Sequence, residues 1–127
     1  MRQEFRVKGL NEPVSHYTDA VRWGDLLFIS GLAPLDEAGR LVGEDDVAAQ
    51  TRQIFRNMAK ILEAASAGFE DVLRVTVYLT DISDRPKINP VRQEFFGATR
   101  PASTLVEVSG LFRPDVLVEI QAVAIKS

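Results

Sequence analysis

Cysteine is absent from this chain, and histidine occurs once, as His16. Without a thiol the protein has no thiolate nucleophile, no disulfide and no cysteine-ligated zinc site. A single imidazole cannot assemble a histidine-based metal site, and His16 lies beside Tyr17 in an expected loop. We therefore interpret His16 as a solvated surface residue, and thiol and histidine–metal chemistry are excluded.

Long apolar runs are also missing, since no stretch approaches the roughly 18 residues that a membrane-spanning helix needs. The first ten residues, MRQEFRVKGL, lack the apolar core of a signal peptide. Net charge is −3, which does not favour a nucleic acid or an anionic membrane as a partner. Together with the missing cysteine, these features predict a cytoplasmic protein without a membrane segment.

The common catalytic motifs do not occur either. The chain has no GxxxxGK[ST] or GxGxxG phosphate loop, no GxSxG nucleophile turn, no HExxH zinc motif and no EF-hand loop. A function must therefore be argued from the predicted fold and from polar residues in unexpected places.

At 127 residues the chain is long enough for one domain, 1–127, with a core that needs no disulfide or metal. Helical spacing of apolar residues predicts a helix that starts at Asp45 or Asp46. A second helix is predicted over 83–97, with a break at Pro90 and a new start capped by Asn89. Alternation and turn residues predict strands over 4–8, 18–23, 26–32, 71–80 and 102–109, and a last strand ending near 125.

This order predicts an α+β fold with two helices. The last strand is apolar on both sides, with Val118 and Ile120 on one face and Leu117 and Val123 on the other. Strands that are buried on both faces show this pattern. Because two helices cover only one face of a sheet, we expect a second copy of the chain to cover the other, in a closed homo-oligomer.

Two acids, Glu107 and Glu119, lie within the apolar strands of the segment 100–125. A carboxylate in such a strand must be paired, hydrogen-bonded or placed at a cleft, because burying it alone is very unfavourable. One reading is a structural acid that is bonded to backbone N–H groups or to an arginine. The other is a functional general acid or base, and the sequence pattern leaves both open.

Several motifs in the right order resemble the Rid family, also called YjgF. They are RPAS-T-VEV and GL-RPD-LVEI in the closing segment, Tyr17 before the hairpin, FISG at 28–31, AAQTRQ at 48–53, VYLTD at 77–81 and a stretch from Asn89 ending in EFF. The resemblance covers nearly the whole chain.

This resemblance implies a chorismate-mutase-like mixed sheet with two helices on one face, in a homotrimer whose sheets form an inner barrel. Archetypal members hydrolyse reactive enamines and imines such as 2-aminoacrylate, without a metal or cofactor, at clefts between subunits. Related members have been described as endoribonucleases or translation inhibitors. By position, Glu119 would be the acid that positions water. The residues expected to line the cleft with it are Tyr17, Ser30, Gly31 and Asn89.

The sequence departs from the family at Ser103, where the deaminases carry an arginine that binds the substrate carboxylate. A hydroxyl offers weaker hydrogen bonds and no charge, so the substrate is expected to differ from 2-aminoacrylate. Arg113, in the loop GLFRPD, is our candidate replacement, and Ser103 stays a candidate binding residue. The alternatives are a trimer that binds a small ligand or partner without catalysis, and a ribonuclease. The low basicity weighs against a ribonuclease.

Overall fold

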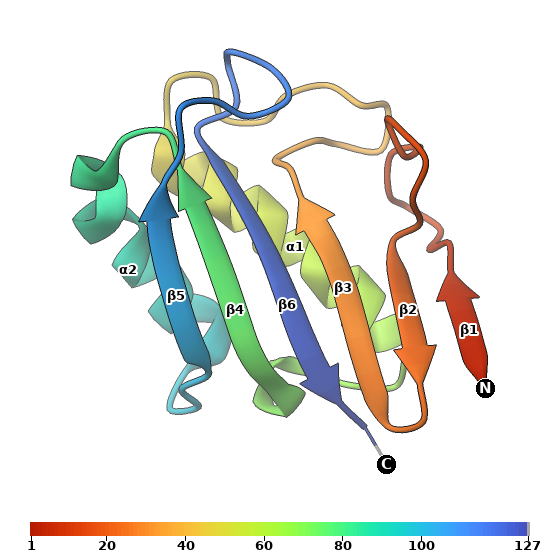
Figure 1. Cartoon of the computed structure of the whole chain (residues 1–127). Helices are drawn as coiled ribbons and strands as arrows, with labels where there is room; N and C mark the ends of the chain where they lie inside the picture. Colours follow the sequence, from red (N-terminus) through yellow and green to blue (C-terminus); the bar gives the residue numbers. More distant parts are fainter. Residues whose placement is uncertain (127) are drawn as a thin grey trace.

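The computed structural model describes residues 1–126 and forms a sheet with two long helices (Figure 1). The strand order across the sheet is β1-β2-β3-β6-β4-β5. All neighbouring strands are antiparallel except β4 and β5, which are parallel and joined through α2. The elements are β1 (Arg2–Phe5), β2 (Ala20–Trp23), β3 (Leu26–Leu32), α1 (Val47–Ala64), β4 (Val72–Leu79), α2 (Arg85–Phe96), β5 (Ala102–Glu107) and β6 (Val118–Ile125), with short 3₁₀ turns at Phe69–Asp71 and Ile82–Asp84.

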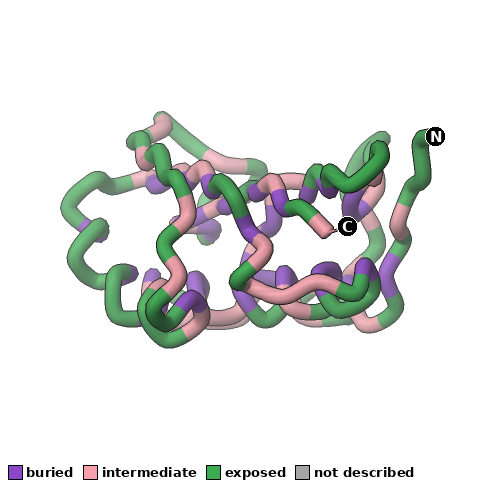
Figure 2. The backbone as a smooth tube through the Cα atoms, turned by 90° about the horizontal axis from the view of Figure 1, so that it is seen from below, coloured by how far each residue is buried: buried purple, intermediate pink, exposed green. Residues whose placement is uncertain are grey.

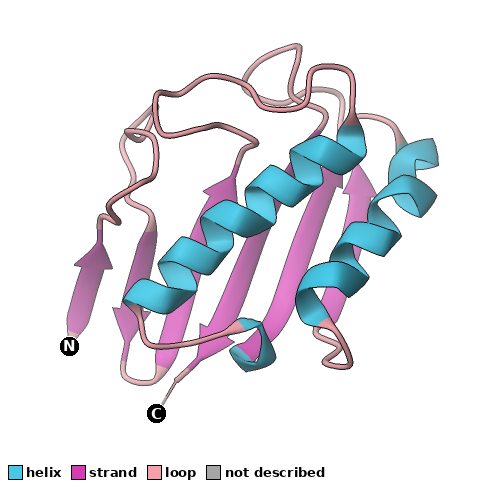
Figure 3. Ribbon diagram, turned by 180° about the vertical axis from the view of Figure 1, so that it is seen from behind, coloured by secondary structure: helices cyan, strands magenta, loops and turns pink. Residues whose placement is uncertain are grey.

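Both helices lie on the same face of the sheet (Figure 3), which confirms the predicted two-layer α+β arrangement. Buried residues gather between the helix layer and the sheet when the molecule is viewed along its layers (Figure 2). Within residues 1–126, no helix lies over the other face of the sheet (Figure 3). Within the described residues, neither helix has the length and apolar character needed to cross a membrane.

The sequence of helix α1 explains where the helix begins and which of its faces is buried. The Asp46 carboxylate accepts a hydrogen bond from the Ala49 amide and so caps the helix at its N-terminus. The predicted apolar stripe is buried against the sheet, with Ile54 and Met58 fully covered. Gln50 is also fully buried; its amide donates to the carbonyl of Asp115, and its Oε1 accepts from the amide of Leu117. This side chain ties α1 to the loop that precedes β6.

Strand β6 lies in the middle of the sheet, between β3 and β4. Val118, Ile120 and the other even-numbered positions are buried beneath the helices. Successive side chains in a strand point to opposite faces, so Glu119 and the other odd-numbered positions lie on the face away from the helices.

The uncovered face carries large apolar side chains. The strand register places Phe28 beside Val123, and Leu26 beside Ile125, so all of them share the face of Glu119. Trp23 lies next to Leu26 on this face. Of these exposed side chains, Trp23 is 60% accessible, Phe28 46% and Ile125 40%. A sheet face with this composition resembles an interface more than a solvated surface.

Two strand details differ from the sequence prediction. β1 spans Arg2–Phe5 rather than 4–8, because the chain leaves the ladder and the Val7 amide donates instead to the Asp19 carboxylate over 2.7 Å. In β4 a register shift between Val72 and Arg74 turns Leu73 outward. The alternation of the predicted strand 71–80 places Leu73 on one apolar face with Val75, Val77 and Leu79, but Leu73 is 47% exposed and Val72 is buried in its place.

The predicted break at Pro90 is wrong, because α2 continues through this residue to Phe96. Asn89 is an exposed residue inside the helix and caps nothing. An interior proline costs a helix about 3 kcal/mol. Ile88, Val91 and Phe96 are buried around it, and each buried side chain of this kind contributes roughly 1.5–3 kcal/mol. Tertiary packing outweighs the local penalty.

Candidate functional site

A cavity of about 400 Å³ lies between the loop before β2, the end of β3 and the loop before β6. Its lining includes Tyr17 from the first loop, Ser30 and Gly31 from β3, and Glu119 from β6. The structure thus brings together these residues, which are far apart in the sequence. The volume is that of a site for a small molecule.

Glu119 is the acid of this cavity. Its carboxylate makes no hydrogen bond or ion pair within residues 1–126, whereas every buried side-chain polar atom there has a partner. Its oxygens are therefore open to the cavity rather than enclosed. Partial burial raises the pKa of Glu119 above the ordinary value for a glutamate. A carboxyl with these properties is suited to give and take a proton.

Gly31 permits the position of Glu119. A Cβ at residue 31 would lie 2.3 Å from the Glu119 Oε2 and 3.0 Å from its Cδ. The pairing of β3 with β6 shifts register between Ile29 and Leu32, so Gly31 lies in an irregular part of the strand. Bulges often redirect side chains next to functional sites. Here the irregularity and the missing side chain let the carboxylate approach the backbone.

Ser30 joins β3 to the loop that carries Tyr17. Its hydroxyl donates to the carbonyl of Thr18 over 2.6 Å, and its amide donates to the carbonyl of Asp19 over 3.0 Å. The Thr18 hydroxyl in turn donates to the carbonyl of Phe5 over 2.6 Å. Ser30 therefore fixes Thr18, the residue next to Tyr17, and it also lines the cavity.

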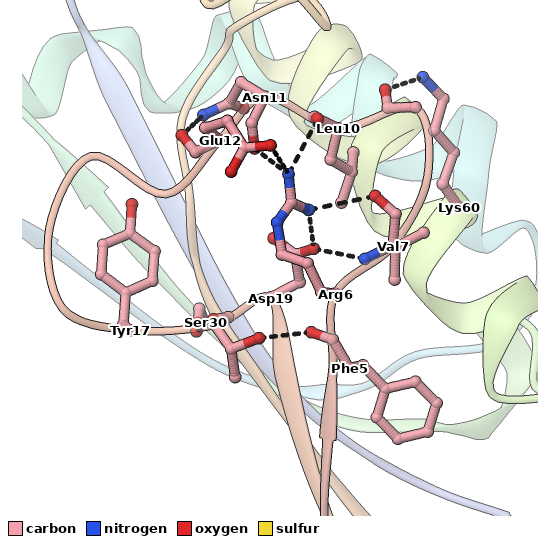
Figure 4. A network of polar contacts seen from close by, with 12 residues as sticks. Phe5, Arg6, Val7, Leu10, Asn11, Glu12, Tyr17, Asp19, Ser30 and Lys60 are labelled. Carbon is pink, nitrogen blue, oxygen red and sulfur yellow. Dashed lines mark hydrogen bonds and ion pairs between the residues drawn. The ribbon is translucent and has the colours of Figure 1, made fainter.

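The first part of the same loop is held by Arg6 and Asp19 (Figure 4). Asp19 is only 6% exposed, and its Oδ2 accepts from Arg6 Nη1 over 2.5 Å. The Arg6 Nη2 also donates to the carbonyls of Leu10 and Asn11, at 3.3 and 3.1 Å. These bonds fix the loop to the ends of β1 and β2, so the segment that carries Tyr17 is held in place.

The remaining predicted residues lie elsewhere. Asn89 and Ser103 are on α2 and β5, outside the lining of the cavity. Arg113 also does not line it: its Nε is 3.3 Å from the Asp115 Oδ1, and its Nη1 donates to the carbonyl of Gly39. Its neighbour Phe112 lines the cavity instead.

Glu107, the other acid of the apolar strands, has a structural partner. Its Oε1 accepts from the Ile82 amide over 2.8 Å, at the start of the 3₁₀ turn before α2. Of the two readings of this residue, the structure favours the acid bonded to a backbone N–H group.

Three further residues were not found by sequence reasoning. Phe112 lines the cavity, and Asn57 lines it from α1 while donating to the carbonyl of Leu35 over 3.0 Å. Arg92 of α2 donates to the Ser103 hydroxyl over 2.8 Å. Phe112 adjoins Arg113 in the loop GLFRPD, which was a usable signal, but Asn57 and Arg92 occupy ordinary helix positions in the sequence.

A mixed six-stranded sheet with two helices on one face matches the chorismate-mutase-like fold, and the crystal structure of the YjgF gene product of E. coli has this fold. That structure matches with a TM-score of 0.90 and 32% identity, covering 98% of this chain and 99% of the other. A family model described as Endoribonuclease L-PSP matches residues 9–126. The chain therefore belongs to this family, the Rid or YjgF family that its motifs resemble.

Two relatives extend the comparison. A RutC family protein of Pyrococcus horikoshii is 41% identical over 126 residues, which cover 99% of each chain. The 3-aminoacrylate deaminase RutC of Acinetobacter baylyi is 38% identical over 117 residues, which cover 92% of each chain. The first of these similarities spans all segments that form the cavity.

Proposed function

We propose that this protein hydrolyses small reactive enamines or imines, with Glu119 as the general acid and base. The observation that carries the proposal is the unpartnered, partly buried carboxylate of Glu119 facing a small cavity. An uncompensated acid of this kind is unfavourable for stability, and such groups concentrate at functional sites. The relative named 3-aminoacrylate deaminase, an enzyme for an enamine, supports the same reaction class.

The reaction needs one proton donor and one water. The neutral carboxyl of Glu119 gives its proton to the enamine carbon, which converts the C=C–N group to an iminium. The resulting carboxylate takes a proton from a water molecule whose oxygen forms a bond to the iminium carbon. The carboxyl of Glu119, protonated again, gives its proton to the amino nitrogen of the carbinolamine and takes the proton of its hydroxyl as the C–N bond breaks. Ammonia leaves and the carbonyl forms, so an enamine and one water give a carbonyl compound and ammonia. A raised pKa favours the protonated form that begins this sequence.

We further propose a homotrimer in which the uncovered sheet faces point inward and the cleft lies between copies. The exposed apolar side chains of Trp23, Phe28 and Ile125 support burial of this face. The expected cleft residues also fall into two groups: Glu119 lies on the uncovered face, and Ser103 lies on the helix side of β5. One chain cannot bring the two groups together, so the complete site requires a second copy.

The substrate is proposed to differ from 2-aminoacrylate, because position 103 is a serine, which puts no charge where the deaminases hold that carboxylate. In 3-aminoacrylate the carboxylate is one carbon farther from the carbon that bears nitrogen, so it needs a charge at a different place. To test this, 2-aminoacrylate is generated in situ by a PLP-dependent dehydratase, 3-aminoacrylate is supplied in a parallel assay, and carbonyl product is followed with added protein. We expect acceleration with 3-aminoacrylate, little with 2-aminoacrylate, and a gain on 2-aminoacrylate in Ser103→Arg. If no enamine is turned over but the cavity binds its carbonyl product, the protein is a non-catalytic binder and the proposal fails.

A further inference from the structure

A second group of polar side chains lies at the margin of the sheet, away from the cavity. The register places Ser103 beside Val75, which is fully buried beneath the helices, so Ser103 faces α2. From α2, the Nη2 of Arg92 donates to the Ser103 Oγ over 2.8 Å. β5 is the last strand in the order of the described sheet, and this hydrogen bond is exposed. The pair is therefore open to a ligand or to another chain.

Arg92 lacks an acidic partner. None of the ion pairs within residues 1–126 includes it, whereas Arg52 on α1 pairs with Glu94 over 3.1 Å. Partial burial lowers the pKa of Arg92, and no neighbouring charge offsets this effect. A guanidinium has five N–H donors, and Ser103 accepts from one of them. A cation partly removed from water without an opposing charge is unfavourable, so the half-buried guanidinium of Arg92 favours an anionic ligand.

The surroundings of Arg92 indicate the kind of anion. A planar guanidinium matches a carboxylate through two parallel hydrogen bonds. Asn89 precedes Arg92 by three residues on α2 and is exposed, so its amide lies on the same helix face. A single cation with neighbouring amide and hydroxyl groups fits a small monocarboxylate. Arg92 is the eighth residue of α2, so the helix N-terminus that a polyphosphate would favour is not at this position.

We propose that Arg92, held in place by Ser103, binds the carboxylate of a small organic acid. The inference rests on the proposed function: the carboxylate belongs to the enamine or to its carbonyl product, and a second copy brings this edge against the neighbouring cavity. Ser103 is then a positioning residue, which takes up one donor and directs the rest of the guanidinium outward. The positive charge at this edge of the sheet is then that of Arg92 on α2, rather than that of an arginine on β5.

The test measures binding by isothermal titration of the full chain with two carboxylates, pyruvate and benzoate, and with their neutral counterparts, methyl pyruvate and benzamide. In Arg92→Ala we expect carboxylate affinity to fall about 10- to 100-fold, as for the loss of hydrogen bonds to a charged group, with neutral ligands unaffected. Arg92→Lys should lose less carboxylate affinity, because lysine keeps the positive charge but not the two parallel N–H donors of the guanidinium. The control is Arg56→Ala, which removes an exposed arginine from α1.

A swap variant, Arg92→Ser with Ser103→Arg, keeps one cation and one hydroxyl at the same edge and should restore carboxylate binding. Thermal unfolding and size-exclusion chromatography check that each variant stays folded and keeps its assembly. Three results would overturn the inference: equal carboxylate affinity in wild type and Arg92→Ala, loss in Arg113→Ala instead, or no preference of the wild type for either carboxylate over its neutral counterpart.

The two proposals fail separately. Carboxylate binding that needs Arg92, in a protein that turns over no enamine, supports this inference and removes the proposed catalysis. Enamine turnover with an unchanged KM in Arg92→Ala supports the catalysis and removes this inference.

Discussion

Glu107 and Glu119 are both acids inside apolar strands, yet the sheet gives them opposite surroundings. Glu107 lies beside Leu79 on the helix side and accepts a hydrogen bond from the Ile82 amide. Glu119 lies beside Tyr78 on the uncovered side, faces a cavity and has no partner within residues 1–126. The same residue type in the same kind of strand is hydrogen-bonded in one place and open to a cavity in the other. The two acids differ in whether a hydrogen-bond donor lies within reach of the carboxylate. The alternation of side chains along a strand does not reveal this.

The largest expected effects come from removing each acid in turn, which tests this comparison directly. Loss of a general acid–base group typically lowers turnover by about 10²- to 10⁴-fold. We expect a loss of this size in Glu119→Gln with the enamine that the wild type turns over best, measured as kcat. Glu107→Ala should keep the wild-type kcat and instead lower the free energy of unfolding by about 1 kcal/mol, as for one hydrogen bond. A loss of kcat in Glu107→Ala with Glu119→Gln unaffected would reverse the assignment.

A smaller effect is expected when Glu119 is displaced rather than removed. In Gly31→Ala the new methyl group would overlap the Glu119 Oε2, so the carboxylate must move away. A glutamate side chain is flexible, so we expect turnover to fall about tenfold while the free energy of unfolding changes by less than about 1 kcal/mol. Kinetics and chemical denaturation of the same sample measure both. Wild-type turnover in this variant would show that the close approach is not needed.

The smallest effect is on stability as a function of pH. Because burial raises the pKa of Glu119 in the folded state, the folded protein binds more protons than the unfolded chain between the two pKa values. The contribution of Glu119 to the free energy of unfolding is thus fully present below the pKa of the unfolded state. It is lost as pH rises through the pKa of the folded state. The free energy of unfolding of Glu119→Gln should therefore increase relative to that of the wild type as pH rises. At acid pH the difference between the two should be constant. Urea unfolding at fixed protein concentration from pH 4 to 8 measures this, and a flat difference would contradict the raised pKa.

The sequence predicted those parts of the fold in which local pattern and packing agree. The apolar stripe of 47–65 gave helix α1 correctly, and the apolar pattern before 125 gave strand β6. The pattern failed at Pro90, where tertiary burial overrides a local penalty, and at Leu73, where a register shift changes the parity. Both depend on contacts between segments that are distant in the sequence.

The site was predicted through a resemblance rather than through spacing. Tyr17, Ser30 and Gly31 carry no sign of their common cavity, since the irregular pairing near Gly31 is invisible in an otherwise apolar strand. Arg92 was missed for a related reason. A lone arginine on a helix looks like a solvated residue until its partner on β5 and the absence of an acid are both known.

The buried Gln50 has a consequence for how a ligand enters. One wall of the cavity includes Phe112, in the loop that Gln50 binds at Asp115 and Leu117. Moving this wall requires breaking the hydrogen bonds of a fully buried side chain in the first turns of α1. Such an opening is a local unfolding event, whereas the side chains of Tyr17 and Phe112, which are 46% and 43% exposed, can change rotamer without one. Entry of a ligand into the cavity should therefore follow rotation of these two side chains rather than movement of the loop.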